Sequence, residues 1–347
     1  MLYVLHATEA TRRRRIGLMG MNNQHDDRAL FALREFFRNS LGFQLPPLPA
    51  PPRTAKNLDK ACSALLDFPI ASLHANAGLA NRAPLRSEAV TDAMRRQLRG
   101  ASNEKVAAAL EGLVADYVEK RDRRTRVLEL AAQEIMQGSA SIDADRFLDE
   151  DWMAFFKSKV DHLATDESKL FFGKVLAGEI KRPGSFSKRS LNILAEMGPG
   201  VGHLFDTLCN ISTVVSTRHV RVMTLGLGDV GENSLEEFGL PFEALNHLIE
   251  AGLIFSEYNT YVDMPHAALG HPFELGGDFY CLHVTEERQA ELDTPDKRAA
   301  ALGAVPGVTL SAAGRELRAI VAKRTVHAYV QRLATGFAEI GFDLQRA

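Results

Sequence analysis

The chain lacks any apolar run long enough to cross a bilayer. The nearest such run among its 347 residues, 61–80, is interrupted by Asp67, Pro69 and His74. The segment after the basic stretch 12–15 is too short and too polar to be the apolar core of a signal peptide. The sequence therefore predicts a protein with no membrane span, and we expect its first residues to form a disordered leader.

Cysteine is scarce, and its few copies lie far apart. The three cysteines, Cys62, Cys209 and Cys281, form no C-x-x-C pair, which favours reduced thiols and a cytoplasmic setting. The sequence also has no G-x-S-x-G motif, no Walker loop and no H-E-x-x-H motif. We therefore predict no cofactor and no catalytic residue, and we expect a protein that is not an enzyme.

Positive side chains are missing from a long internal window. Residues 222–287 contain 12 Asp and Glu but no Lys or Arg, although the net charge of the whole chain is only −3. Residues 1–138, by contrast, carry 21 Lys and Arg against 15 Asp and Glu. Because affinity for nucleic acid depends largely on cations that displace counterions from phosphates, the acidic window is a poor surface for DNA or RNA. Only the N-terminal half is a candidate for contact with nucleic acid.

Apolar spacing predicts a mainly α fold, and composition divides the chain into five segments. Residues 1–56 are predicted to be a disordered leader and a proline-rich linker, because each proline restricts its own backbone and the residue before it. Residues 57–138 are predicted to form N-terminal helices, and 139–212 a central antiparallel helical bundle. Residues 213–325 are predicted to form an acidic winged-helix-like α+β domain with an enlarged β wing, and 326–347 a C-terminal helix.

The second N-terminal helix carries an apolar stripe at three- and four-residue spacing. Its members are Val106, Leu110, Leu113, Val114, Tyr117 and Val118. The helical pattern continues to Gly138, but Lys120 and Arg124 fall where a heptad seam needs apolar residues. We therefore expect a helical hairpin or bundle packed on other elements, and not a long uniform coiled coil.

Start and stop residues place the helices of the central segment. The first is expected to begin near 149–151 and to bury one stripe, made of Trp152, Phe155, Phe156, Val160 and Leu163. Thr165 is expected to cap the second. Its buried face would use Leu170, Phe171, Val175 and Leu176. Pro183 and Gly184 then break the chain before a third helix, and a fourth continues to Ile211.

After Ser212 the sequence alternates between strand-like and helix-like stretches. Residues rich in β-branched and aromatic side chains predict strands in 214–225, 253–263, 279–285 and 307–310. Between the first two, Pro241 and Gly252 mark the start and the end of a helix, and Ser311 begins a later one. This order is that of a winged helix whose wing spans 257–306.

The stretch Gly226–Gly231 has the spacing G-x-G-x-x-G, which in dinucleotide-binding proteins opens a helix beneath a pyrophosphate. The surroundings do not fit, because Gly239 and Pro241 break the following helix soon after it begins. We interpret the motif as a loop before a helix-turn-helix segment. DNA reading by that segment is also disfavoured, because its helix offers Glu243 and Glu250 and no positive side chain.

Two clusters are candidates for binding a ligand. A candidate anion contact surrounds a loop and a helix N-terminus, and consists of Lys181, Arg182, Lys188 and Arg189. A candidate zinc site in the wing would use His266, His271, Cys281 and His283. The spacing of this second set matches no known zinc finger, so we predict no metal ligand and interpret these residues as part of a surface wing. The alternative for the first set is a solvated joint between helices.

The central segment resembles a bacterial family catalogued as domain of unknown function 2806. The matching residues are Trp152, Leu176, Ala177, Glu179, Pro183, Gly184, Phe186, Ser187, Arg189 and Leu191. The resemblance covers about 145–322 and departs from the family pattern at Phe172, where Trp is common. It implies a bacterial cytoplasmic protein, of the kind encoded near mobile elements or phage-defence genes, and no activity. The motif residues are expected to determine the fold through a cap, a turn and a packed aromatic layer.

The leading functional prediction is a non-catalytic protein-interaction or adaptor protein that self-associates. It depends on the uneven charge, the long N-terminal helix and the missing catalytic motifs. Two alternatives stay open: a nucleic-acid-associated regulator that uses the basic N-terminal helices, and a metal-dependent enzyme with its site in the wing at 263–283.

Overall fold

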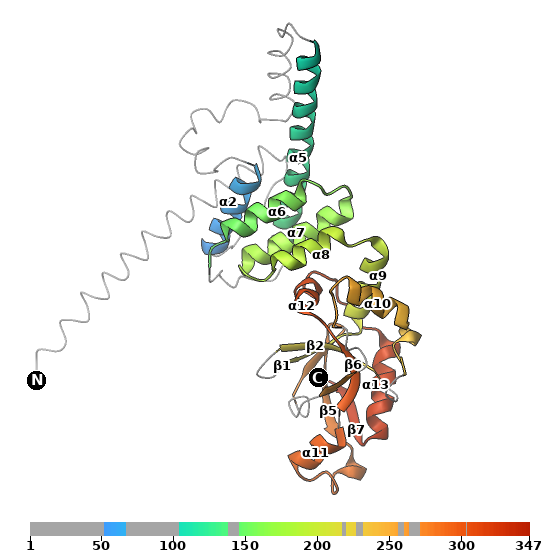
Figure 1. The fold of residues 1–347 in the computed structure, drawn as a ribbon. Coiled ribbons are helices and arrows are strands. Elements are labelled where there is room, and N and C mark those ends of the chain that lie inside the picture. The colour runs from blue at the N-terminus through green and yellow to red at the C-terminus, as the bar shows by residue number, and fades with distance from the viewer. Residues whose placement is uncertain are drawn as a thin grey trace, which may run out of the picture. The chain divides into compact units, whose positions relative to one another are not determined.

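The fold is taken from a computed structural model of the whole chain (Figure 1). The residues that it describes are 52–66, 104–137, 146–216, 220–226, 232–255, 260–263, 271–302 and 304–347. The predicted leader and most of the linker lie outside these ranges, as do Gly228 and Gly231 of the glycine motif and His266 of the candidate zinc set. Among the described residues, no helix is both long and apolar enough to cross a bilayer.

The chain divides into two compact units, Met1–Lys188 (unit 1) and Arg189–Ala347 (unit 2). This division lies inside the segment 139–212 that we predicted as a single bundle, so that detail is not confirmed. The coarser prediction holds, because the protein is mainly helical and its strands form an antiparallel sheet.

Unit 1 is built from four described helices. They are α2 (Pro52–Leu66), α5 (Glu104–Gln137), α6 (Glu150–Val160) and α7 (Asp166–Lys181). Helix α2 begins five residues before the predicted start at 57, because proline is well accommodated in the first turn of a helix. The predicted start of α6 near 149–151 and the predicted cap Thr165 are confirmed. Asp149 accepts from the Trp152 N–H at 2.7 Å, and Thr165 accepts from the Ser168 N–H at 3.1 Å.

The buried face of α7 differs from the predicted one. Val175 and Leu176 are buried as expected, but Leu170 is 40% exposed, and Phe172 and Gly173 lie in the core instead. Helix α7 packs against both α5 and α2, so its covered face is wider than one amphipathic stripe. At Gly173 the approach is close, because an added Cβ would lie 2.7 Å from the Leu130 Cβ on α5.

Unit 2 contains two leading helices, α8 (Lys188–Glu196, whose first residue closes unit 1) and α9 (Pro199–Asn210), followed by a mixed segment. That segment runs β1 (Thr213–Ser216), β2 (Val220–Leu225), η2 (Glu236–Phe238), α10 (Phe242–Glu250), β3 (Thr260–Asp263), β4 (Phe273–Leu275), β5 (Asp278–Val284), η4 (Glu286–Arg288), α11 (Pro295–Leu302), β6 (Ala304–Thr309), α12 (Ala312–Arg318), α13 (His327–Glu339) and β7 (Phe342–Arg346). The strands form one antiparallel sheet in the order β3-β6-β2-β1-β4-β5-β7.

Several predicted helix boundaries of unit 2 are confirmed. Helix α10 follows Pro241 and is closed by Gly252, whose φ of 72° suits glycine. Ser311 caps α12, and its hydroxyl accepts from the Gly314 N–H at 3.0 Å. Gly314 is required there, since a Cβ would lie 2.1 Å from the Leu253 carbonyl oxygen.

The sheet is larger than a winged helix requires, so the winged-helix detail is not confirmed. Strands β1 and β2 precede α10 and form the middle of the sheet, between β6 and β4. The predicted C-terminal helix over 326–347 is wrong at its end, because α13 stops at Glu339 and β7 pairs with β5. Gly341, with a φ of 87°, makes the turn between them.

Candidate protein-interaction surface

Helix α5 is packed along only one half of its length. In its second half, the packed half (Lys120–Gln137), buried residues recur at helical spacing: Arg124, Val127, Leu128, Ala131, Ala132 and Ile135. The first half, the projecting half (Glu104–Glu119), extends beyond α6 and α7 in Figure 1. Of its residues whose side chains the structure describes, none is buried.

The projecting half carries exposed apolar side chains on one face. Leu113 is 65% exposed and Tyr117 is 39% exposed, and Val114 and Val118 beside them are half-buried. We call these four residues the α5 stripe. A single exposed leucine is ordinary, but four apolar residues on consecutive turns of one helix form a contiguous surface of the kind that binds protein.

A buried ion pair fixes the point where the two halves of α5 meet. Arg124 donates to both carboxylate oxygens of Asp161, at 2.5 and 2.7 Å, and its Nη1 lies 3.4 Å from the Leu65 carbonyl oxygen. Arg123 donates to the Asp161 carbonyl at 2.6 Å. These contacts explain why the apolar seam is interrupted at Arg124: the guanidinium joins α5 to the end of α6 instead of facing a second helix.

The basic residues at the foot of the projecting half are paired along the helix. Lys120 lies 2.6 Å from Asp116, Arg126 lies 3.0 Å from Glu129, and Arg123 pairs with Glu119. Exposed pairs of this kind contribute little to stability, roughly 0.3–0.5 kcal/mol each. Pairs this weak would yield to a phosphate backbone, so the nucleic-acid alternative stays a prediction.

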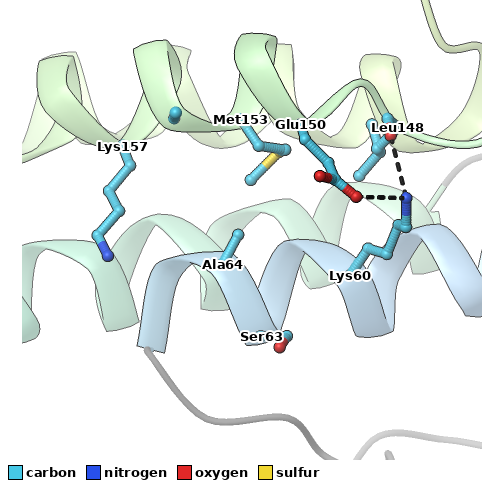
Figure 2. A pocket seen from close by; sticks show the side chains of 8 residues that line it. Lys60, Ser63, Ala64, Leu148, Glu150, Met153 and Lys157 are labelled. Carbon is cyan, nitrogen blue, oxygen red and sulfur yellow. Dashed lines mark hydrogen bonds and ion pairs between the residues drawn. The ribbon is translucent and has the colours of Figure 1, made fainter.

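A hollow of about 430 Å³ lies between α2 and α6 (Figure 2). Its floor is apolar, with Ala64 and Met153 facing each other across the two helices. Lys60 at one end is held by its own unit, since its Nζ lies 3.4 Å from the Leu148 carbonyl oxygen and 3.8 Å from the Glu150 carboxylate. The hollow therefore offers an apolar patch, and Lys60 at its end is already paired.

The residues that carry the family resemblance build one turn. Glu179 is 1% exposed, and its carboxylate accepts from the backbone N–H of Gly184 at 2.6 Å and of Phe186 at 3.0 Å. The Trp152 indole donates to the Phe186 carbonyl at 2.7 Å. The Phe186 ring packs on Gly178, where a Cβ would lie 2.7 Å from it. The motif thus determines how the chain leaves α7, as its sequence suggested.

The four residues of the candidate anion contact have different surroundings. Lys181 donates to the Glu134 carbonyl at 3.2 Å, and the Lys188 ammonium lies 5.9 Å from the centre of the Phe155 ring. Arg182 is exposed at the end of α7. In unit 2, the Arg189 guanidinium lies against Gly252. The anion contact stays a prediction.

The candidate zinc residues that the structure describes lie at the surface of unit 2. Cys281 and His283 are on the same side of β5, as their alternation predicted, and His271 and His283 are exposed. Within the described part of the chain, no three His, Cys, Asp or Glu side chains are grouped as a metal site would require.

The acidic window is partly neutralised by cations from later in the chain. Glu274 lies 2.9 Å from Arg318 and 2.8 Å from Lys323, and Asp278 lies 2.7 Å from Arg346. Burial opposes ionisation of Glu274, but hydrogen bonds from Lys323 and Arg318 outweigh it and lower its pKa. The linear sequence predicts an acidic surface without positive side chains. Around Glu274 and Asp278 this is wrong, because cations from later in the chain lie beside both carboxylates.

The apolar spacing predicts the residues of the α5 stripe but not their exposure. The stripe was expected to pack on other elements, because the spacing is the same whether a helix face is covered or open. It also missed the Arg124–Asp161 pair, since 37 residues separate the two partners and no local pattern connects them.

Taken together, the described chain is a mainly helical protein with an antiparallel sheet, an internally hydrogen-bonded motif and a half-packed helix. The chain belongs to the family described as protein of unknown function (DUF2806), whose model matches residues 118–334. This match confirms the resemblance and begins within α5, so most of the α5 stripe precedes it. No curated protein matches the chain. No solved structure matches it either.

Proposed function

We propose that this is a non-catalytic interaction protein that self-associates through the α5 stripe. The observation that carries the proposal is the exposure of Leu113 and Tyr117 on a helix whose other half is firmly packed. Because the packed half already fixes the helix, covering its free half requires little further ordering of the backbone.

The apolar area supports association of modest strength. Fully burying a leucine or a valine contributes about 1.5–3 kcal/mol, and association costs several kcal/mol in lost freedom of movement. Four partly exposed apolar residues on each of two chains are therefore expected to give a weak complex. Its population should depend on protein concentration.

We also propose finer features of the fold and a setting for the protein. The order of η2, α10, strands and α12 supports a winged-helix-like core within unit 2, used for contact with protein. The contacts among α2, α5, α6 and α7 support a helical bundle in unit 1. We also propose a bacterial cytoplasmic protein from a mobile-element or phage-defence locus, as the resemblance in the sequence implies.

The test is the mass of the full chain by size exclusion with light scattering, at rising concentration. Wild type should increase in mass from monomer toward dimer, and Leu113→Glu should stay monomeric, because a charge would be buried in the interface. The matched control is Ala115→Glu, which adds the same charge to the same half of α5 at an exposed position off the stripe.

Circular dichroism should give the same helical content for all three proteins, so that a change in mass is not a change in fold. A wild-type chain that stays monomeric at every concentration would refute the proposal. Equal association of wild type and Leu113→Glu would move the interface elsewhere on the molecule.

A further inference from the structure

The α5 stripe lies on the same face of the helix as the residues that are buried in unit 1. A residue every 100° places Leu113 and Tyr117 on the same side of the helix as Leu128, Ala131 and Ile135. The covered face of the packed half therefore continues, without a change of phase, into the open face of the projecting half.

This shared face restricts how a second copy can cover the stripe. Helices α7 and α2 pack on that face along the packed half, in each copy. In a parallel pair, the α7 and α2 helices of both copies would occupy the same space between the two α5 helices. In an antiparallel pair, they lie at opposite ends of the overlap, and no such clash arises.

We propose that the partner of the α5 stripe is the same stripe of a second copy, with the two α5 helices antiparallel. This inference rests on the proposed function, since it specifies the partner and the direction of the contact made by that surface.

The symmetric overlap predicts which positions meet. It places position 106 opposite position 117 of the second copy, and position 110 opposite position 113. These four positions hold Val106, Tyr117, Leu110 and Leu113, so each layer of the pair is apolar.

Disulfide trapping distinguishes the two directions. Two chains with one added cysteine, Val106→Cys and Tyr117→Cys, are made on a Cys281→Ser background. Cys281 is the half-exposed native thiol, whereas Cys62 and Cys209 are buried and are kept. In the antiparallel pair, two copies of position 117 lie about 16 Å apart along the axis, too far for a disulfide, which needs Cα atoms within about 7 Å.

We therefore expect no linked dimer from either chain alone under mild oxidation, and a linked dimer from their mixture. Leu113→Cys lies near the two-fold axis and should link with itself, which shows that the helices can be trapped. Each variant is checked for association by light scattering, so that a lost interface is recognised.

A linked dimer from Tyr117→Cys alone, with none from the mixture, would show a parallel pair and overturn this inference while leaving the proposed function intact. The antiparallel inference would also be overturned if wild type is dimeric but no cysteine variant or mixture gives a linked dimer. A wild-type chain that is monomeric throughout, with slow exchange of the stripe amides, would assign the stripe to another part of the same chain and overturn both.

Discussion

Glu179 is the clearest case in which one residue sets the path of the chain. Its carboxylate is buried and accepts hydrogen bonds from two backbone N–H groups of the turn that follows α7. A carboxylate can accept both bonds at once, whereas an amide offers one oxygen and would turn a donor toward a donor. The residue is therefore specified by hydrogen bonding and not by volume.

Glu179→Gln is expected to destabilise unit 1 by roughly 2 kcal/mol or more, since buried hydrogen bonds to a charged group are lost and an N–H is left unsatisfied. Guanidinium unfolding followed by tryptophan fluorescence measures this directly, because Trp152 is the single tryptophan of the chain and lies in unit 1. Glu167→Gln, at an exposed position of the same helix, is the control. Equal midpoints for the two variants would show that the turn does not depend on the carboxylate.

At the residue scale, the sequence predicts which residues determine the fold better than it predicts which groups those residues contact. Trp152, Glu179 and Phe186 could be singled out as fold determinants, and Asp149 and Thr165 as the region of the helix caps, because caps and motifs are local. Which backbone group each side chain contacts depends on how α6 and α7 lie together, and no spacing rule gives that.

At the scale of elements, the contact between α5 and α7 is controlled by one glycine. Gly173 lets α7 approach α5 so closely that an added Cβ would lie 2.7 Å from the Leu130 Cβ and 3.3 Å from the Ala131 backbone nitrogen. Gly112, in the projecting half of α5, has no atom within 4 Å of an added Cβ. The same substitution is therefore expected to have opposite effects at the two positions.

Gly173→Ala should destabilise unit 1 by about 1–3 kcal/mol through overpacking. Gly112→Ala should be neutral or stabilise the chain by up to about 1 kcal/mol, because alanine has the higher helix propensity. In the same fluorescence assay, the unfolding midpoint of Gly173→Ala should lie below that of wild type, and that of Gly112→Ala should be equal to or above it. Destabilisation by both substitutions would mean that the projecting half is packed closely in solution.

The sequence predicts most of the helices themselves, but it does not predict which elements pack or pair beside them. The helices α5, α6, α7, α10 and α12 follow from apolar spacing, caps and breakers. The buried face of α7 and the strand β7 did not follow, because both depend on what packs beside them. Phe342–Arg346 is too short and too polar to stand out as a strand until β5 is present to pair with it.

At the scale of the whole molecule, charge is distributed unequally between the units. Unit 1 carries 29 Lys and Arg against 24 Asp and Glu, and unit 2 carries 12 against 20. The acidic window of unit 2 is less exposed than its sequence suggests, since Arg318, Lys323 and Arg346 fold back onto its carboxylates. Its remaining acidic surface disfavours contact with nucleic acid, and the α5 stripe of unit 1 is the stronger candidate for association.

The most direct measurement of the central proposal is amide hydrogen exchange of α5 in the full chain at low and at high protein concentration. Peptides from 108–119 should exchange rapidly when the chain is dilute and several-fold more slowly when it is concentrated, because a partner then covers the stripe. Peptides from 127–135, already buried in unit 1, should exchange slowly at both concentrations. Exchange of 108–119 that is the same at every concentration would contradict self-association through the stripe.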